Sequence, residues 1–337
     1  MAKAERILLG HGGGGRLSRD LIDGEVLSRF GEGPLRGLPD GASLTASSTA
    51  LVFSTDSFVV HPLEFPGGDI GHLAVHGTVN DLAVCGARPR WLSLGLILEE
   101  GLDLALLRRI LDSIRDAAAD CGVQIVTGDT KVVASGQCDG MYINTAGIGE
   151  AIPGLELGPE RLRDGDAVVV NGPLGDHGMA VMAARSGMDA GSELSSDTAA
   201  VNRLVEAAAD IGPDLRFMRD PTRGGLAAVL NEAVEGSSLG ISIREEAVPF
   251  SRGARAIAEV TGIDPLHSAS EGRLVLVCNG ARAREVVERW RRLPNGEGTA
   301  VIGEVVAAER GRVVMETAIG GRRLVDVPQG ELLPRIC

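Results

Sequence analysis

Aromatic side chains make up only 3% of this chain of 337 residues, which has one tyrosine and two tryptophans. Proteins that bind single-stranded nucleic acid stack the bases on such rings. Basic residues are also in deficit, with 33 lysines and arginines against 46 acidic residues and a net charge of −13. A surface of that sign repels phosphate backbones and anionic lipids. We therefore expect neither nucleic acid nor a membrane as a partner.

Cysteines are also scarce. Five are present, at positions 85, 121, 138, 278 and 337. Their odd number and the lack of a C-x-x-C pair argue against a disulfide framework and a zinc site. No apolar run approaches the ~18 residues of a transmembrane helix, and the N-terminus lacks the apolar centre of a secretory signal. These features favour a protein of the reducing cytoplasm.

Glycine, by contrast, is abundant, with 47 residues, about twice the usual share of ~7%. Hydrophobic residues make up 44% and charged residues 23%, which is ordinary for a globular protein. At ~150 residues per domain, a chain of 337 residues has room for two domains, each with its own core.

Both halves of the chain mix strand and helix patterns without strict alternation, which favours an α+β fold over a doubly wound parallel sheet. Residues 153–166 contain glycines, prolines and charges with little periodicity, so we interpret them as the domain connection. The predicted division is a domain of residues 1–155, a domain of residues 156–320 and a mobile C-terminal tail of residues 321–337.

In the first half, residues 49–60 read as a strand interrupted at its polar Ser-Thr-Asp-Ser stretch. Apolar residues at helical spacing predict a helix over 69–85. A second helix is expected over 103–121, because Asp103 lies in its first turn and Gly122 follows its end.

Three aspartates stand in polar settings beside apolar segments. Asp56 interrupts the strand above, Asp81 ends the run Thr-Val-Asn-Asp, and Asp129 follows a predicted strand over 123–126. Burying a lone carboxylate is costly, and carboxylate oxygens beside phosphates suit magnesium. The three residues are therefore candidate magnesium ligands, and helix capping or turn formation remains the alternative for each.

Glycine clusters recur at residues 11–15, 66–69 and 223–225. Glycine lets backbone amides approach an anion closely, although no cluster matches the P-loop or dinucleotide pattern. The run Asp-Pro-Thr-Arg-Gly-Gly-Leu reads as a loop entering a helix, with Thr222 as a candidate N-cap, and helix N-termini hold anions. Lys131, next to a glycine turn, is either a phosphate contact or a surface lysine.

Cys337 is the last residue of the chain. A terminal cysteine is either a free thiol without a role or a nucleophile and acyl carrier on a flexible arm. His72 and His76 are four residues apart, as two imidazoles on one helix face would be, but the zincin motif needs a glutamate after the first histidine. We interpret this pair as a polar patch on the helix.

Four segments resemble the ATP-binding half of the aminoimidazole ribonucleotide synthetase superfamily: Phe53-Ser-Thr-Asp-Ser57, Gly67-Gly-Asp-Ile-Gly71, residues 77–84 and Thr127-Gly-Asp-Thr-Lys131. Within that superfamily, residues 11–15, the run Asp220-Pro-Thr-Arg-Gly-Gly-Leu and above all the terminal Pro334-Arg-Ile-Cys337 resemble the carbamoyl dehydratase family of nickel–iron hydrogenase maturation. The resemblance implies two PurM-like α+β domains and a homodimer formed by the N-terminal halves, with ATP and Mg²⁺ near that interface.

The same resemblance implies a reaction and its partners. The carbamoyltransferase HypF places a carbamoyl group on the terminal cysteine, here Cys337. ATP then drives dehydration of the S-carboxamide to a thiocyanate, and the cyano group passes to iron in the HypC–HypD complex. The implied catalytic residues are Cys337, Lys131 and Glu271. The implied ATP-binding residues are Asp56, Gly68, Asp69, Asn80, Asp81, Thr127, Gly128 and Asp129, of which Asp56, Asp81 and Asp129 hold the metal.

An amide oxygen becomes a good leaving group once it is phosphorylated. The carboxamide oxygen therefore attacks the γ-phosphate in our hypothesis, with Glu271 as the base and Lys131 as the electrostatic partner of the phosphoryl oxygens. The alternative for Glu271 is a turn residue before the strand expected over 272–278. The alternative for the whole chain is another ATP-dependent small-molecule kinase or ligase of the superfamily, which would not need Cys337. A third alternative is a non-catalytic scaffold that binds nucleotide and partner proteins, and the retained aspartates and Lys131 argue against it.

Overall fold

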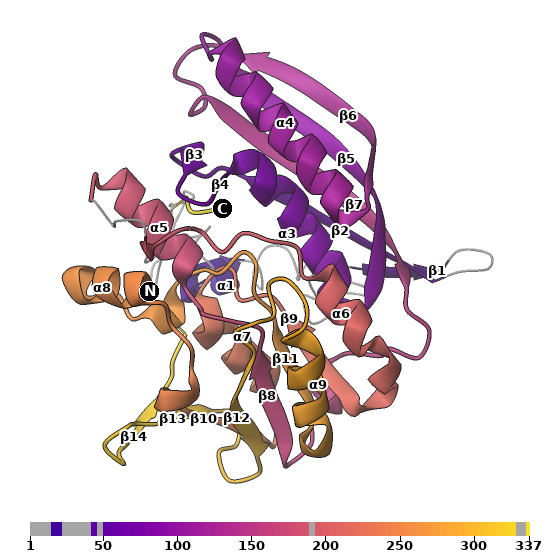
Figure 1. The fold of residues 1–337 in the computed structure, drawn as a ribbon, viewed down its shortest axis with the longest axis vertical. Coiled ribbons are helices and arrows are strands. Elements are labelled where there is room, and N and C mark those ends of the chain that lie inside the picture. Colours follow the sequence, from indigo (N-terminus) through magenta and orange to yellow (C-terminus); the bar gives the residue numbers. More distant parts are fainter. Residues whose placement is uncertain (1–14, 22–41, 46–49, 189–192, 328–334) are drawn as a thin grey trace.

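A computed structural model describes residues 15–21, 42–45, 50–188, 193–327 and 335–337. Of the sequence motifs, His11–Gly14 and Pro334 lie outside these ranges. Within them, the side chains of a few residues are also outside the description, namely residues 17, 18, 21, 42–45, 104, 127, 129, 130 and 132. The described chain forms two α+β halves, each with its own mixed sheet (Figure 1). The predicted fold class is therefore confirmed.

The first half contains a five-stranded sheet in the order β1-β2-β7-β5-β6. Only the β5–β6 pair is parallel, and the other neighbours are antiparallel. The strands of this half are β1 (Ala42–Thr45), β2 (Ala50–Phe58), β3 (Glu64–Phe65), β4 (Gly68–Asp69), β5 (Ala87–Glu99), β6 (Gln124–Val133) and β7 (Met141–Ala151). The helices are α1 (Arg16–Leu21), α3 (Ile70–Val84) and α4 (Leu104–Cys121). Helices α3 and α4 cover one face of the sheet (Figure 1).

Helix α3 is the central element of this half. Asp69 caps its N-terminus, because its Oδ1 accepts hydrogen bonds from the amides of Gly71 and His72 at 2.8 and 3.0 Å. The helix is apolar on nearly all sides and almost wholly buried, since the sheet covers one side of it and the second half of the chain the other. Helix α4 is amphipathic instead, with Asp103 as its N-cap and Gly122 ending it at φ 73°.

The second half contains a seven-stranded sheet in the order β14-β13-β10-β12-β8-β11-β9, in which only β10 and β13 run parallel. Its strands are β8 (Asp166–Val170), β9 (Leu215–Arg219), β10 (Gly240–Arg244), β11 (Val275–Asn279), β12 (Ala300–Val306), β13 (Val313–Glu316) and β14 (Arg322–Leu324). Its α-helices are α5 (Asp176–Arg185), α6 (Asn202–Ala208), α7 (Gly225–Val234), α8 (Arg252–Thr261) and α9 (Ala283–Trp290). Short 3₁₀ turns are η3 (Pro159–Arg161), η5 (Ala209–Asp214), η6 (Glu245–Ala247), η7 (Pro265–His267) and η8 (Gly280–Arg282).

The boundary between the halves falls after Ala151 and before Asp166, where the first sheet ends and the second begins. The exact domain limits stay a prediction. Residues 322–324, which the sequence places in the tail, pair with β13 and extend the second sheet. The tail that follows ends between the two halves, where the C-terminus lies beside β4 and α5 (Figure 1).

Strand β2 differs from its expectation, because it runs unbroken through the polar stretch. Ser54 is buried on the side of the sheet that faces α3, and its hydroxyl donates a hydrogen bond to Oδ2 of Asp81 at 2.7 Å. Thr55 points to the opposite, open face. The polar stretch does not interrupt β2, because the polar side chain of Ser54 on the covered face has a hydrogen-bond partner.

Candidate active site

The last three residues dock in the groove between the two halves. The amide of Val59 donates a hydrogen bond to the carbonyl oxygen of Cys337 at 3.1 Å, and the amide of His61 donates to that of Arg335 at 3.3 Å. The tail thus pairs edge to edge with the segment after β2, as an added strand does. Ile336 is buried in the core of the first half, and the half-buried Cys337 packs against the same cluster.

Helix α5 contacts the other edge of the tail. Nε2 of His177 lies 2.6 Å from the carbonyl oxygen of Ile336. Arg185, at the end of the same helix, donates to the carbonyl oxygens of Arg335 at 2.5 Å and His61 at 2.7 Å. The carbonyl oxygens of all three tail residues are therefore hydrogen-bonded, by the segment after β2 on one side and by α5 on the other, which fixes the position of Cys337.

Arg223 is the cationic centre of the site. Its guanidinium lies 3.3 Å from Oδ1 of Asp56. The pKa of Arg223 is raised, first by negative charge at Cys337 and then by Asp56, Glu271 and Asp81. The glycine loop before α7 therefore brings a guanidinium to the meeting point of the tail, β2, α3 and the loop that carries Glu271.

Glu271 is buried, and its Oε1 has no hydrogen-bond partner among the residues that the structure describes. Burial raises the pKa of Glu271 well above its ordinary value of 4.5, and the charges of Asp220, Asp56 and Asp197 add to the rise, which Arg223 opposes. A carboxyl group whose pKa is raised in this way binds a proton more readily than an ordinary carboxyl group and can exchange it with a neighbouring group. This is the property of a group used for proton transfer.

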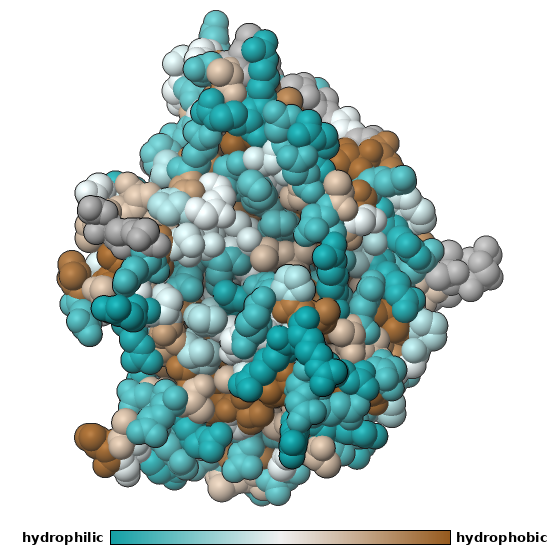
Figure 2. All heavy atoms as spheres, viewed as in Figure 1, coloured by the Kyte–Doolittle hydropathy of each residue, from teal (hydrophilic) through white to brown (hydrophobic). Residues whose placement is uncertain are grey.

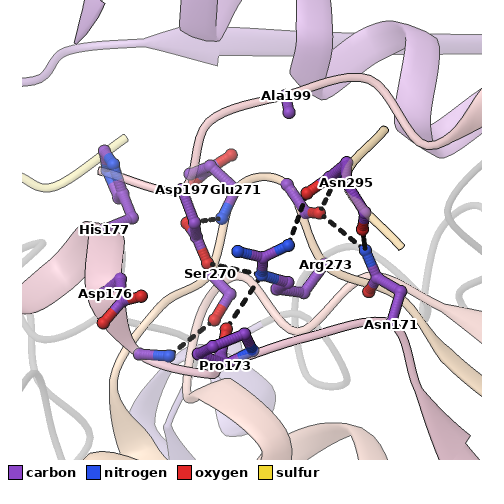
Figure 3. A network of polar contacts seen from close by, with 12 residues as sticks. Asn171, Pro173, Asp176, His177, Asp197, Ala199, Ser270, Glu271, Arg273 and Asn295 are labelled. Carbon is purple, nitrogen blue, oxygen red and sulfur yellow. Dashed lines mark hydrogen bonds and ion pairs between the residues drawn. The ribbon is translucent and has the colours of Figure 1, made fainter. Parts of the chain in front are cut away.

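The main chain at Glu271 is held by a polar network (Figure 3). The amide of Glu271 donates to Oδ1 of the fully buried Asp197 at 2.9 Å, and Arg273 lies 3.5 Å from the other oxygen of Asp197. Nε of Arg273 also donates to the carbonyl oxygen of Pro173 at 2.8 Å. A Cβ on Gly272 would lie 1.9 Å from the carbonyl oxygen of Asp197, so the two loops touch. These contacts fix the main chain at Glu271, and the fixed main chain limits the positions that its carboxyl group can take.

Asp56 and Asp81 fit the oxygen ligands of a magnesium ion. Asp81 faces Ser54 on the covered side of β2, and both aspartates act on Arg223. Burial raises the pKa of Asp56, and Arg223 and the amide of Ser57 partly offset that rise. Within the described side chains, no three acidic, histidine or cysteine groups gather as a ready metal site. The side chains of Asp129 and Thr127 lie outside the description.

The structure does not bring Lys131 to this cluster within one chain. Lys131 lies exposed on the edge strand β6, opposite Ile97 of β5. The order of the sheet places β7 and β5 between β6 and β2. With neighbouring strands about 4.8 Å apart, Asp56 and the Gly128–Asp129 backbone are about 14 Å apart. The strand order therefore separates the backbone of Gly128 and Asp129 from Asp56 within one chain.

Three other predicted residues have structural contacts here. Both carboxylate oxygens of Asp69 are used, since Oδ2 accepts from Ser113 at 2.5 Å while Oδ1 caps α3. A Cβ on Gly68 would meet the side chain of Thr198 at 2.8 Å. Asn80 donates to the carbonyl oxygens of Ala199 and Glu271, each at 3.0 Å, and accepts from an amide of the second half. These residues hold α3 against its neighbours.

Several residues of the site have no role in the sequence prediction. They are Arg223, Asp220, Asp197, His177 and Arg185. The signal for the first two was present, because both belong to the motif that runs from Asp220 to Leu226. The other three are single residues whose meaning depends on a fold that brings α5 and residues 196–198 to the tail.

Two family models match the chain along most of its length. The N-terminal domain of AIR synthase related proteins matches residues 39–151, and the C-terminal domain matches residues 163–316. The two halves thus define an AIR synthase related protein. A carbamoyl dehydratase HypE of Rhodobacter capsulatus is 48% identical over 338 aligned positions, which cover 99% of this chain and 98% of the relative.

Solved structures agree with this similarity. A HypE–HypF complex matches with a TM-score of 0.87 and 40% identity over 91% of this chain and 99% of that chain. A HypE structure in complex with ATP matches with a TM-score of 0.82 and 46% identity over 98% of this chain and 100% of that one. The chain belongs to the HypE family, the carbamoyl dehydratases of hydrogenase maturation.

The predicted family, enzyme class and function are therefore confirmed over the alternative of a small-molecule kinase or ligase. A thiamine monophosphate kinase bound to AMPPCP and TMP shares the fold with a TM-score of 0.68, at only 21% identity. In the part of the chain that the structure describes, no helix combines the length and apolar character needed to cross a membrane.

Proposed function

We propose that Cys337 carries the carbamoyl group and that Glu271 and Arg223 act on it where the tail docks. The observation that carries this proposal is the docked position of Cys337, whose carbonyl oxygen accepts a hydrogen bond from Val59 at 3.1 Å and whose negative charge raises the pKa of Arg223. The solved complexes of HypE with HypF and with ATP support HypF as the donor and ATP as the co-substrate. We further propose the HypC–HypD complex as the cyano acceptor and the cytoplasm as the location.

The chemistry needs one phosphoryl transfer and two proton transfers. The carboxamide oxygen attacks the γ-phosphate of ATP, ADP leaves, and one nitrogen proton passes to solvent water. Glu271 takes the second nitrogen proton as the C–O bond breaks, so that phosphate departs and S–C≡N remains. The atoms balance as S-carboxamide plus ATP giving thiocyanate, ADP and phosphate. Arg223 neutralises the negative charge that gathers beside Cys337 during these steps.

Asp56 and Asp81 are the proposed magnesium ligands of this chain. Both offer hard carboxylate oxygens, and together they are the one or two carboxylates that a magnesium–nucleotide site normally uses. The ion supplies charge neutralisation for the triphosphate. Gly68, Asp69 and Asn80 act on the nucleotide through the position of α3, because their polar groups are already bonded within the protein.

Thr127, Gly128, Asp129 and Lys131 are the proposed contribution of a second copy to the same site. They lie on β6, at the edge of a sheet whose strands β2 and β5 expose Phe53, Trp91 and Ile97. We propose that two chains pair through this apolar face as a homodimer. In that pair, Lys131 of one chain serves the carboxamide of the other, and its place on the edge strand β6, three strands from β2, supports this arrangement.

Intact mass spectrometry tests the proposal directly. After incubation with HypF, carbamoyl phosphate, ATP and Mg²⁺, we expect an adduct on Cys337 that is one water lighter than the carbamoyl form. Without ATP, only the carbamoyl form accumulates. The C337A variant gains neither adduct but keeps ATP binding, and the exposed-position variant S135A serves as a control that gains both. Turnover of a small molecule by a chain without its tail would overturn the proposal.

A further inference from the structure

His177 makes a contact with the tail that the chemistry above does not use. Its side chain is completely buried at the start of α5, and its Nε2 lies 2.6 Å from the carbonyl oxygen of Ile336. In Figure 3 the yellow ribbon of the tail passes beside the imidazole. The residue next to the reactive cysteine is thus bound by a side chain of the second half of the protein.

The hydrogen bonds around His177 define a single tautomer. Burial lowers the pKa of His177 to about 4, so the ring is neutral at physiological pH. Because a carbonyl oxygen only accepts, Nε2 carries the proton and donates it to Ile336. Nδ1 is then an acceptor for the hydroxyl of Ser196 at 2.7 Å, whose oxygen accepts from the amide of Thr198 at 3.1 Å.

The ring is also fixed from the first half of the chain. The amide of Ser196 donates to the carbonyl oxygen of Pro66 at 2.7 Å. The ring of Phe65 packs edge-on against the imidazole, with centroids 5.3 Å apart. A Cβ on Gly67 would lie 2.7 Å from the backbone of Ser196, so the turn at Gly67 packs directly against the residue that is hydrogen-bonded to His177. The imidazole therefore has one orientation, with its donor aimed at the tail.

We propose that His177 is a positioning residue that latches the tail in its docked state and holds the S-carboxamide at Glu271. This inference rests on the proposed function of Cys337. The tail must leave to be loaded by HypF, and undocking deprives a buried donor of its acceptor, which is unfavourable. The latch therefore shifts the tail equilibrium toward the docked, reactive state. Arg185 at the far end of α5 holds the preceding carbonyl in the same way.

Alkylation of Cys337 by N-ethylmaleimide measures how often the tail undocks. Cleavage after Glu331 releases the last six residues, so mass spectrometry of this peptide follows Cys337 apart from the other four cysteines. We expect H177F to be alkylated about tenfold faster than the wild type, which corresponds to the loss of one hydrogen bond. H177Q retains an amide donor near the position of Nε2 and should restore slow alkylation.

His76 provides a matched control. It is a second buried histidine whose pKa burial lowers to about 4, and it faces Thr198 instead of the tail. H76F should leave the alkylation rate of Cys337 unchanged. Equal alkylation of wild type and H177F would overturn the latch, and so would an equal acceleration by H76F, because then loosening of the fold and not the tail contact is responsible.

Catalysis supplies an independent reading. In carbamoylated protein, H177F should slow the single-turnover dehydration about tenfold at saturating ATP, leave the KM for ATP unchanged and leave loading by HypF intact. A slower loading step with unchanged dehydration would contradict the latch. If the wild type itself is never loaded or dehydrated, the proposed function fails while the alkylation assay still decides whether His177 holds the tail.

Discussion

Glu271 shows at the scale of one residue how a reactive group is kept at the expense of stability. Its carboxyl is buried with an unpartnered oxygen and lies among three other acidic side chains, with Arg223 as the opposing charge. Ionising it in the folded state is unfavourable, while in the unfolded chain it ionises freely. The same environment that gives the group a proton-transfer pKa therefore destabilises the fold at neutral and alkaline pH.

This imbalance predicts a pH-dependent stabilisation by E271Q. The folded state binds more protons than the unfolded state between the ordinary pKa of 4.5 and the raised pKa, so wild-type stability falls as pH rises through that window. The wild type loses about 1.4 kcal/mol in the free energy of unfolding for each unit by which the pKa of Glu271 is raised, and E271Q does not. Thermal unfolding should show E271Q more stable than the wild type at pH 8, and the difference should vanish below about pH 4.5.

The control for this measurement is E259Q, the same change at an exposed position of α8. It should follow the wild type at every pH. A stability difference for E271Q that stays constant from acid to alkaline pH would contradict the sign argued for the buried carboxyl. The same E271Q protein should accept the carbamoyl group from HypF but dehydrate it about 10²–10⁴-fold more slowly, the usual loss of a general base.

At the scale of elements, α3 joins the two halves of the molecule. Its Asn80 side chain makes three hydrogen bonds to the main chain of the second half, including one to the carbonyl oxygen of Glu271. N80A leaves two carbonyls and the amide of Val201 without partners in a buried place. At about 1 kcal/mol for each unmade bond, we expect a loss of about 2–3 kcal/mol in the free energy of unfolding.

Urea unfolding measures this loss as a lower midpoint. N144A is the matched control, because the amide of Asn144 also makes three hydrogen bonds but lies exposed on β7, where water replaces them. It should cost less than 1 kcal/mol, about the value of a solvated bond. Similar midpoints for N80A and N144A would show that Asn80 does not join the halves.

Most of the elements were predictable from local pattern, and the exceptions have physical causes. The helices expected over 69–85 and 103–121 match α3 and α4 to within one residue, because caps and helical periodicity mark both. The strand expected over 123–126 is the start of the much longer β6, whose glycine and polar residues carry no alternating pattern. Strand β9 and helix α8 were not predicted at all.

The site was predictable only where a contiguous motif carries it. Asp56, Asp81 and Cys337 come from motifs read directly along the chain, and the structure brings their charges to one arginine. The contact of His177 with Ile336 joins residues 159 positions apart, so no local pattern contains it. Lys131 fails to reach the cluster for a similar reason, since the order of strands, and not the motif, sets its distance.

At the scale of the whole molecule, the first sheet has one covered and one open face. The open face exposes 37% of Phe53, 38% of Trp91 and 40% of Ile97, on strands β2 and β5. Figure 2 shows hydrophobic atoms at the margin where β5 and β6 lie. A monomer rarely leaves several large apolar side chains on one face of a sheet in water, and a second copy that covers them forms a closed twofold pair.

Subunit mixing decides whether Lys131 works across that pair. K131A and E271Q chains are each expected to be inactive alone. In a mixed dimer with shared sites, one site has both defects and the other has neither, because its Lys131 comes from one chain and its Glu271 from the other. Random mixing should therefore restore about a quarter of the wild-type dehydration per site, since half of the dimers are mixed and half of their sites are intact. Mixing that restores no activity, while size measurement shows exchanged dimers, would show that Lys131 and Glu271 act within the same chain and would contradict the shared site. F53D, which puts a charge on the open face, should abolish both the dimer and the rescue, and the blue-shifted emission of Trp91 in the dimer would report the loss.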